Sequence, residues 1–457
     1  MALTPLDFPA SPTIGQIHPN PAVSGQPQYT YDGEKWSGGA GVGNVYMSDF
    51  PPAAPVGSLW FETDTGILYV NYNDGSSIQW VAIPGGPSDA VRYGAQTLTE
   101  TQKTQARQNI YAAPFDAMMY SGMQVNGTCE IDQAGIGNVT SSGYGAPYFV
   151  DGWCIQAGGA IQALASAELG TGVPGFTKYV RFYPTTAVAG TLAAGDLGLL
   201  YHRLEGYRVA RLKWGTVNAQ PVTLSFWIRA PRAGFITLSI ANGSINRSYL
   251  ANVAINAVDV WEYKTVTIPG CTDGTWATDH TLGWQIAFCF GGGTNYQGPA
   301  NTWSTSFAVA TSATTNMFAT VGAQTSITGL TIHPGTEAPT AERSPFIARP
   351  YGEELRICQR YFWQWNNSAA VARVAIAYND TGSSGHLILP LPMPLRTSFT
   401  LTASNWSANG AAITSWNINE ARTNLVSLSY GGSGFTVGAT QIYSGAGGAF
   451  IKLDARV

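Results

Sequence analysis

The stretch Val222-Thr-Leu-Ser-Phe-Trp-Ile-Arg229 decides the fold class. Apolar and polar side chains alternate along it, which is the two-residue period of a β-strand that turns one face to a core. The same strand character returns in four further segments, at 235–240, 262–268, 282–290 and 326–332. Turn residues separate these segments, and no helical pattern lies between them. We therefore predict a two-sheet sandwich of the jelly-roll type over residues 122–350.

The composition of the 457 residues favours strands and turns over helices. Gly and Pro, which mark turns, number 53 and 26, and aromatic residues, which favour strands, make up 12%. Charged residues make up only 11%, against about a quarter in an ordinary soluble domain, so the surface must consist largely of neutral polar groups. Helical bundles and coiled-coil rods are thereby excluded as the main architecture.

The charge pattern excludes several classes of partner. The net charge is −4 and no run of Lys or Arg occurs, so the chain lacks the cationic footprint of a nucleic-acid-binding protein. No apolar run reaches the roughly 18 residues of a membrane-spanning helix, so we expect no membrane insertion. The N-terminal residues lack the charged and apolar regions of a secretory signal, and we expect synthesis in a cytosol.

The cysteines and histidines give no reason to expect a bound metal or cofactor. The five cysteines are odd in number, widely spaced and never arranged as C-x-x-C, which argues against a zinc site and against a disulfide framework. The five histidines are equally scattered, and none stands in the H-E-x-x-H spacing of a zinc site. We expect buried thiols, no metal site and no cofactor.

Residues 1–90 contain an internal repeat. Phe8-Pro9 returns as Phe50-Pro51, Gly15 returns as Gly57, and Asp32-Gly33 returns as Asp74-Gly75. Each copy runs from a proline-rich entry through a tyrosine-rich strand and a D-G turn to a tryptophan, which is typical of a hairpin with a tight turn. Two small β modules in tandem are the prediction for this region.

The linker at 91–121 contains one segment with a clear helical pattern, residues 98–110. Thr99 and Gln102 have the spacing of a capping box at its start. Its apolar stripe, Leu98, Ala106 and Ile110, is too thin for a core within one chain but suffices when identical helices pack about an axis. We predict a trimerising helix, and a solvated linker is the alternative.

Residues 351–457 form the last predicted domain. A short helical stretch at 353–359 leads into alternating strands that continue to the end of the sequence. The predicted fold class is therefore all-β: tandem small β modules, a short linker helix, a jelly-roll sandwich and a C-terminal β tip domain.

Three parts of the sequence resemble the tail-fibre and receptor-binding proteins of tailed bacteriophages. The repeat copy from Phe8 to Trp36 is similar to virion-proximal modules of such fibres, and the stretch from Leu98 to Ala112 looks like their trimer joint. The most specific likeness is to the carbohydrate-binding-like jelly roll of these proteins. It consists of Asn126-Gly127, Tyr148-x-x-Asp151-Gly-Trp153, Thr223-Leu-Ser-Phe-Trp227 and a signature from Ser344 to Phe362. The sequence departs from the family at Thr331-Ile-His-Pro-Gly335, where members often have Q-L-E-x-G.

The resemblance implies a homotrimeric fibre of the virion tail that is assembled in the host cytoplasm. Residues 1–90 would bind other tail or baseplate proteins, and the C-terminal β domains would bind a host surface polysaccharide or lipopolysaccharide. The signature also has a structural reading from its residues alone, in which charged residues pair with one another or with neighbouring chains while apolar residues pack inward. The charged residues are Glu353, Glu354, Arg356 and Arg360, and the apolar ones are Leu355, Ile357 and Cys358.

Sugar recognition by a weakly charged protein needs aromatic faces flanked by polar side chains, because a pyranose has an apolar C–H face and a rim of hydroxyls. Two clusters fit this description. The candidates in sandwich loops are Trp276, Asn295, Tyr296 and Trp303, and those that follow the signature are Trp363, Trp365 and Asn366. Any single aromatic residue is more often part of a core, so the prediction is that one of the two clusters contacts the receptor.

Two other functions stay open at the level of sequence. A purely structural virion component, such as a head fibre or a baseplate decoration, is consistent with the same residues. A tailspike depolymerase would need two carboxylates about 5 to 10 Å apart, yet acidic residues are sparse beyond the linker and Glu353-Glu354 is the only adjacent pair there. The sequence also lacks the stacked repeats of a β-helix spike, so we expect no enzymatic activity.

Overall fold

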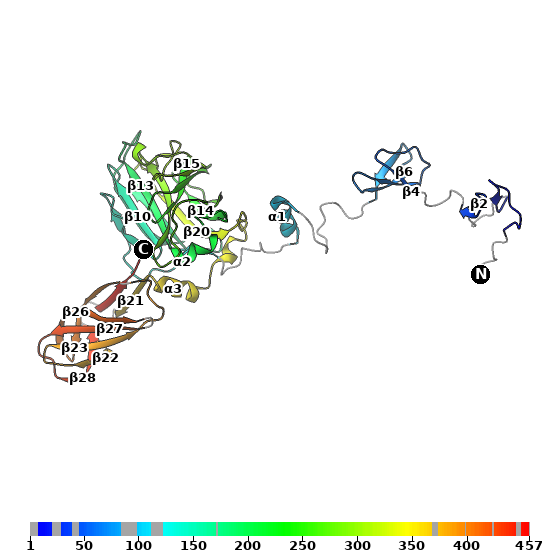
Figure 1. Cartoon of the computed structure of the whole chain (residues 1–457). Helices are drawn as coiled ribbons and strands as arrows, with labels where there is room; N and C mark the ends of the chain where they lie inside the picture. Colours follow the sequence, from blue (N-terminus) through cyan, green and yellow to red (C-terminus); the bar gives the residue numbers. More distant parts are fainter. Residues whose placement is uncertain are drawn as a thin grey trace. The chain divides into compact units, whose positions relative to one another are not determined.

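The computed structural model describes residues 8–20, 29–38, 45–83, 98–110, 122–170, 172–367, 373–397, 399–422, 425–444 and 449–456. The chain divides into two units, Met1–Ala106 and Arg107–Val457. Strands make up most of the regular structure in both units (Figure 1). The all-β fold class predicted from the sequence is confirmed.

The first unit contains two small sheets, as the internal repeat predicts. Their orders are β1-β2-β3 and β4-β5-β6-β7. The D-G turn of each module is held by its aspartate: Asp32 Oδ1 accepts the N–H groups of the two residues after Gly33, and Asp74 Oδ1 accepts those of the two residues after Gly75. These hydrogen bonds lower the pKa of Asp74 to about 2. The strands are β1 (Ile17–His18), β2 (Tyr29–Tyr31), β3 (Trp36–Gly38), β4 (Val45–Ser48), β5 (Leu59–Glu62), β6 (Leu68–Asn73) and β7 (Ile78–Ala82).

The linker helix is α1 (Glu100–Asn109). Its predicted capping box is formed, since the Thr99 N–H donates to Gln102 Oε1 at 3.0 Å and the Gln102 N–H donates to Thr99 Oγ1 at 3.3 Å. The helix is shorter than the predicted 98–110, so only Ala106 of the predicted apolar stripe lies within it, while Leu98 and Ile110 flank it. Leu98 and Ala106 are half-buried and Ile110 is 62% exposed. The role of this stripe in a trimer stays a prediction.

The second unit begins with the predicted jelly roll, in which a seven-stranded and a six-stranded sheet enclose one core (Figure 1). The strand orders are β19-β16-β15-β18-β13-β10-β9 and β17-β14-β20-β12-β11-β8. The strands are β8 (Val139–Ser141), β9 (Tyr148–Val150), β10 (Trp153–Gly158), β11 (Ala163–Leu169), β12 (Lys178–Pro184), β13 (Leu197–Glu205), β14 (Val222–Arg229), β15 (Gly234–Asn242), β16 (Ser248–Ile255), β17 (Glu262–Ile268), β18 (Leu282–Gly292), β19 (Trp303–Ser304) and β20 (Thr325–Pro334). Four short helical segments lie in the connections: α2 (Gly206–Val209), η2 (Ala210–Leu212), η3 (Thr294–Tyr296) and η4 (Ser344–Ile347).

The fold-deciding stretch is strand β14, and it contributes to the core as its alternation predicts. Leu224, Phe226 and Ile228 are fully buried between the two sheets. The opposite face of β14 is covered as well, because Trp227 Nε1 donates a hydrogen bond to Ser344 Oγ in η4 at 3.0 Å. The five cysteines of the chain are buried and free, as expected.

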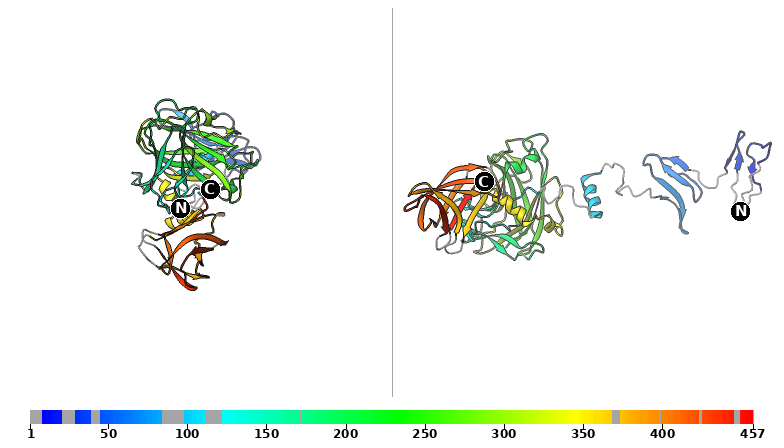
Figure 2. Two further views of the ribbon diagram at one scale, coloured as in Figure 1. Left: turned by 90° about the vertical axis from the view of Figure 1, so that its left-hand side faces the viewer. Right: turned by 90° about the horizontal axis from the view of Figure 1, so that it is seen from below.

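A separate core holds the C-terminal domain together. Six strands close into the barrel β22-β23-β27-β26-β25-β28, and the sheet β21-β29-β24 shares the core of this barrel. Closure leaves the barrel without open strand edges. The elements are α3 (Tyr351–Gln359), β21 (Phe362–Asn367), β22 (Arg373–Asn379), β23 (Ser384–Pro390), β24 (Thr400–Ser404), β25 (Trp406–Ala408), β26 (Ala411–Arg422), β27 (Leu425–Gly432), β28 (Gly438–Ser444) and β29 (Ala449–Asp454). Figure 2 shows the barrel and the sandwich from two further directions.

Helix α3 and its flanking residues fasten the C-terminal domain to the sandwich. Glu354 pairs with Arg349 at 2.7 Å and also accepts the Asn126 N–H at 2.6 Å. Arg360 pairs with Glu205 of β13 at 2.5 Å. Glu354 and Arg360 thus form ion pairs, as the structural reading of the signature expects, but their partners Arg349 and Glu205 differ from the predicted ones, since the reading paired the four charged residues with one another or with neighbouring chains. Across the described residues, no helix is both long and apolar enough to cross a membrane.

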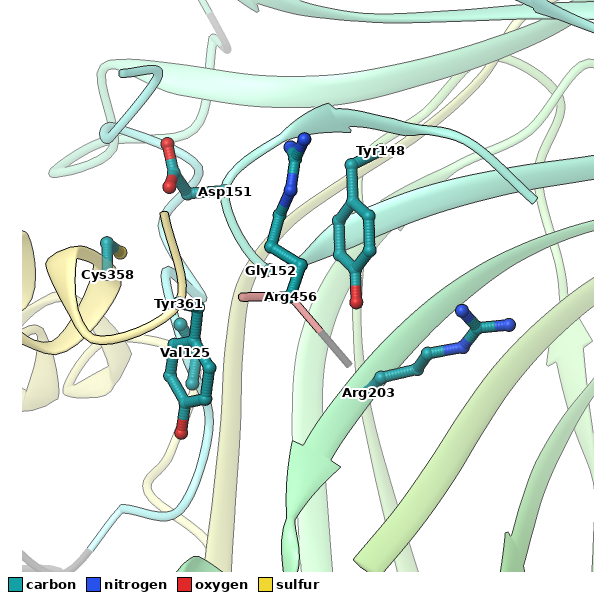
Figure 3. A pocket seen from close by; sticks show the side chains of 8 residues that line it. All are labelled: Val125, Tyr148, Asp151, Gly152, Arg203, Cys358, Tyr361 and Arg456. Atoms are coloured by element: carbon teal, nitrogen blue, oxygen red, sulfur yellow. The ribbon is translucent and has the colours of Figure 1, made fainter. Parts of the chain in front are cut away.

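The separate motifs behind the family resemblance meet at this same buried junction. Asn126 Nδ2 donates to the backbone oxygen of Asp151 at 2.9 Å, and Trp153 Nε1 donates to the backbone oxygen of Asn126 at 3.0 Å. Gly127 has to be glycine, since a Cβ there would lie 2.0 Å from the Leu330 oxygen. Figure 3 shows a small pocket at the junction, lined by residues of the sandwich, of the signature segment and of the chain end. Packing inside the sandwich therefore accounts for Asn126, Gly127 and Trp153, and the hydrogen bond from the Asn126 N–H to Glu354 links them to α3.

Candidate functional site

A cleft lies on the outer face of the seven-stranded sheet. Side chains alternate between the two faces of a strand, so Tyr201 and Arg203 of β13 lie on the face that points away from the sandwich core. The strand register places Arg203 opposite Gln285 of β18 and Gln156 of β10 opposite Leu199. Three neighbouring strands thus form the floor of the cleft.

Three loop segments complete the cleft. The segment 294–310 contributes Tyr296 and Phe307, the loop between β8 and β9 contributes Tyr144, and the loop between β15 and β16 contributes Ile245. The cleft has a volume of about 290 Å³, which is close to the lower end of about 300 Å³ for ligand-binding sites. Its lining consists of Tyr144, Gln156, Leu197, Tyr201, Arg203, Ile245, Gln285, Tyr296 and Phe307.

Tyr144 is held in an unusual conformation at the edge of the cleft. Its φ of 68° lies in the left-handed region, which costs a non-glycine residue about 1–3 kcal/mol and persists only where neighbours impose it. Its N–H donates to the Ala157 oxygen at 2.9 Å, and its O–H donates to the Gly195 oxygen at 2.8 Å. The ring lies directly on Gly158, where a Cβ would be 2.2 Å from Tyr144 Cδ1. Tyr144 is 42% exposed, so a fixed aromatic ring is presented to solvent.

A second tyrosine and three polar side chains lie near this ring. The ring centres of Tyr144 and Tyr296 are 6.5 Å apart, and the rings are tilted by 43°. Gln156 Nε2 donates to the Tyr144 backbone oxygen at 2.6 Å, while Gln285 and Arg203 lie across the floor. Aromatic faces next to amide and guanidinium donors are the combination that a pyranose requires.

The lining of the cleft consists of aromatic, aliphatic, amide and guanidinium side chains. The described residues of this lining include no carboxylate, whereas glycoside hydrolysis commonly uses a pair of Asp or Glu residues. Burial raises the pKa of Cys154 to about 11 and that of Cys289 to about 12, so the thiols on this face stay protonated at neutral pH. Within the described residues, no group of three His, Cys, Asp or Glu side chains is placed to hold a metal ion.

The sandwich candidates predicted from sequence lie in two different places. Tyr296 lines the cleft, and Asn295, the residue before it in η3, is exposed. Trp276 and Trp303 belong to an aromatic cluster around Trp214, with their own ring centres 5.6 Å apart. Trp276 is only 8% exposed, and the indole N–H of each of these two tryptophans donates to a backbone oxygen. The structure therefore brings Tyr296 to the cleft and gives Trp276 and Trp303 a packing role.

The C-terminal candidates lie on strand β21. Trp363 and Trp365 are half-buried and pack against the core of the C-terminal domain, where the ring centre of Trp365 is 5.4 Å from that of Trp406. Asn366 is paired with Phe450 of β29 in the sheet, and its side chain lies outside the described residues. Neither tryptophan lines the cleft, and the contact of the three candidates with a receptor stays a prediction.

Sequence reasoning missed most of the cleft. Tyr144 had a detectable signal, because it stands in Ser141-Ser-Gly-Tyr-Gly145, the kind of glycine-rich loop that drew attention to Tyr296. The strand residues had no such signal. Alternation shows which side chains leave the core, but it does not show which part of an outer face the loops leave open. The missed lining residues are Tyr144, Gln156, Leu197, Tyr201, Arg203, Ile245, Gln285 and Phe307.

Comparison with known proteins gives distant structural likenesses only. No protein-family model and no curated protein matches the chain. A solved structure of the enzymatically active domain of tailspike protein 4 from bacteriophage CBA120 is similar to 48% of the chain, at 8% identity and a TM-score of 0.25. The chain spans only 22% of the length of that tailspike domain.

Carbohydrate-binding modules are also among the similar solved structures. A family 11 module from Clostridium thermocellum, in complex with a β-1,3-1,4-mixed-linked tetrasaccharide, matches 45% of this chain and 100% of its own, at 13% identity and a TM-score of 0.23. A CBM4 structure matches 46% of this chain and 97% of its own, at 15% identity and a TM-score of 0.22. Because these TM-scores are low, the jelly roll is assigned from the strand order of this chain and not from the likenesses.

Proposed function

We propose that the chain is a receptor-binding protein of a phage tail fibre that attaches to a glycan on the host surface. The observation that supports glycan binding most directly is the ring of Tyr144. It is fixed against Gly158 at a strained φ, it is 42% exposed, and it stands with Tyr296 beside a cleft lined by amide groups. Backbone strain of this kind is typical of functional sites, where the surrounding structure over-determines it.

The remaining parts of the proposal concern assembly. Residues 1–90 attach the fibre to other virion proteins, and α1 together with its flanking residues joins three copies through Leu98, Ala106 and Ile110. Support comes from the tandem modules, from the completed capping box of α1 and from the exposed Ile110. Three cleft-bearing copies turn a weak single-site affinity into firm attachment, because each later contact is intramolecular.

The proposed activity is binding without cleavage. The lining of the cleft supplies no carboxylate for general acid or base catalysis. Incubation of the full chain with the glycan that it binds is expected to release no reducing ends. Release of reducing ends by the purified full chain would contradict this part of the proposal.

Substitution of the two cleft tyrosines tests glycan binding. The full chain is probed on an array of bacterial surface polysaccharides, and the affinity for a soluble oligosaccharide of the binding glycan is then measured by calorimetry. Tyr144→Ala and Tyr296→Ala are each expected to weaken binding by roughly five- to tenfold or more, since loss of an aromatic anchor costs more than about 1 kcal/mol.

A matched control separates the cleft from general effects of losing a tyrosine. Tyr207 in α2 is 60% exposed and does not line the cleft, so Tyr207→Ala is expected to bind as the unmodified chain does. Unchanged affinity in both cleft variants would remove this cleft as the receptor site. A folded trimer that binds neither the array nor host cells would instead favour a purely structural virion component.

A further inference from the structure

The cleft of the sandwich carries one charge, and this charge is positive. Arg203 is the only cation among the side chains that line the cleft, and none of them is Asp or Glu. Charged residues make up only 11% of the chain, and its net charge is −4. A cation inside a cleft of such a protein therefore stands out from the average surface.

Contacts on the floor of the cleft position the Arg203 guanidinium. Its central carbon lies 5.1 Å from the centre of the Tyr201 ring, within the range of a cation–π contact. Arg203 also borders the junction pocket, where Figure 3 shows its side chain near Tyr148, with which it shares a hydrogen bond. The side chain is half-buried. Two aromatic side chains thus hold a guanidinium at the edge of the cleft.

Two carboxylates near the cleft are engaged away from it. Glu205, two residues along β13, accepts hydrogen bonds from Arg360 Nε and Nη2 and from the Tyr361 O–H, so its charge belongs to the joint with α3. Asp196, at the other end of β13, accepts two backbone N–H groups, those of Ala160 and Ala193. Neither carboxylate lines the cleft, so the described residues that line it carry a net charge of +1.

A single guanidinium selects for a particular ligand chemistry. Its parallel N–H donors match the two oxygens of a planar carboxylate, and such bonds are about twice as strong as those between neutral groups. One partly buried cation balances one negative charge, whereas a phosphate monoester carries close to two. A neutral sugar would remove water from the guanidinium without supplying a counter-charge.

We infer that the cleft binds an acidic glycan, in which the carboxylate of a uronic acid or related sugar acid pairs with Arg203 while the sugar ring lies against Tyr144 and Tyr296. This inference rests on the proposed function and adds the class of glycan to it. The single positive charge of Arg203 thus favours a glycan with one carboxylate over neutral glucans and over phosphorylated sugars.

The test uses the full chain and chemically matched ligands. The array carries neutral polysaccharides, sulfated dextran, and polysaccharides that contain uronic or sialic acids. Each acidic polysaccharide that binds is then reduced at its carboxyl groups to the neutral alcohol, which preserves the sugar backbone. We expect binding to carboxylated members and at least a tenfold loss on reduction, which corresponds to about 1.4 kcal/mol.

Variants of Arg203 locate the effect. Arg203→Gln is expected to bind the carboxylated form about tenfold more weakly than the unmodified chain does, and to lose much less affinity for the reduced form. Arg203→Lys keeps the charge but not the planar fork, and its affinity is expected to be intermediate. Arg356 is exposed on α3 and does not line the cleft, so Arg356→Gln is the control with the same loss of charge and is expected to bind normally.

The outcomes separate this inference from the proposed function. Binding of carboxylated and reduced forms within about twofold of each other overturns the acidic-glycan assignment and leaves glycan binding intact. Sulfated dextran bound as tightly as the carboxylated glycans overturns the choice of a carboxylate. The comparison of ligands uses the unmodified chain, so it holds even where an Arg203 variant fails to fold. A full chain that binds no glycan on the array overturns the proposed function and this inference with it.

Discussion

Gly158 determines where the Tyr144 ring lies, because the ring occupies the space that a side chain at position 158 would fill. A Cβ at position 158 would be 2.2 Å from Tyr144 Cδ1 and 2.3 Å from Cε1. Because Tyr144 is 42% exposed, the clash is relieved when the ring moves outward rather than by unfolding of the sheet. Gly158→Ala is therefore expected to weaken glycan binding by about tenfold and to change the melting temperature by less than about 3 °C.

Calorimetric affinity and thermal unfolding of the same samples check this prediction. Gly352 in α3 has no atom within 4 Å of an added Cβ, so Gly352→Ala is a control without a clash; it is expected to leave the affinity unchanged and to raise the melting temperature slightly, because Ala favours a helix more than Gly does. A Gly158→Ala variant that binds as well as the unmodified chain would show that the position of the Tyr144 ring has no bearing on recognition.

A comparison of Tyr296 with Trp276 shows why the candidate site could be predicted only in part. Tyr296 and Trp276 were both selected because aromatic residues in glycine-rich loops are poorly explained as core. For Tyr296 the criterion led to the cleft, whereas Trp276 packs against Trp214 with ring centres 4.8 Å apart. The two tryptophans are far apart in the sequence, and no local pattern shows that they meet. Tertiary partners of this kind decide whether a loop aromatic faces a ligand or a core.

Local sequence patterns predicted well where helices and strands occur and which of the two each segment forms. The alternating stretches 222–229 and 262–268 coincide with β14 and β17, and the predicted helix at 353–359 begins two residues earlier as α3. Period-two alternation is a property of consecutive residues, so it can be read without a partner strand. The order of strands in a sheet cannot be read from consecutive residues. Strand β14, for example, lies between β17 and β20, and β20 is about a hundred residues away in the sequence. The cleft floor depends on such order and was therefore not predictable.

The buried ion pair between Arg349 and Glu354 of α3 leads to a prediction about the stability of the joint between the sandwich and the C-terminal domain. Arg349 is 8% exposed and pairs with Glu354, so Glu354→Gln leaves a buried guanidinium without its counter-charge while the volume of the side chain is kept. Breaking a buried pair in this way costs about 3–5 kcal/mol. We expect the melting temperature of the full chain to fall by several degrees, as measured by calorimetry.

The neighbouring acidic residue gives the control for this joint. Glu353 is exposed on the same helix, and Glu353→Gln changes the melting temperature by less than about 1 °C if burial of the pair is what matters. Equal melting temperatures for Glu354→Gln and Glu353→Gln would mean that the Arg349 pair contributes nothing measurable to the attachment of the C-terminal domain.

At the scale of the whole molecule, the proposed adhesion depends on the number of clefts that one fibre presents. A thin apolar stripe such as Leu98, Ala106 and Ile110 gains enough burial only where copies of α1 pack about an axis. We expect the unmodified chain to sediment at three times its mass of 48.5 kDa and Ile110→Asp to sediment as a single chain, because the variant places a charge in the helix contact. Gln108→Asp, at an exposed position of α1 two residues before Ile110, makes the same charge change and is expected to stay trimeric.

The Ile110→Asp variant is expected to keep its affinity for a single glycan and to lose attachment to a surface that carries many glycans. Its affinity for a soluble oligosaccharide is expected to equal that of the unmodified chain, since the cleft is formed within one copy of the sandwich. Its attachment to a surface that carries many copies of the glycan is expected to fall by about 10²- to 10⁴-fold, because the later contacts are no longer intramolecular. Surface plasmon resonance on immobilised polysaccharide measures this difference. An unmodified chain that sediments as a monomer, or an Ile110→Asp variant that stays trimeric, would contradict the role of α1, and equal attachment of trimer and monomer would contradict multivalent adhesion.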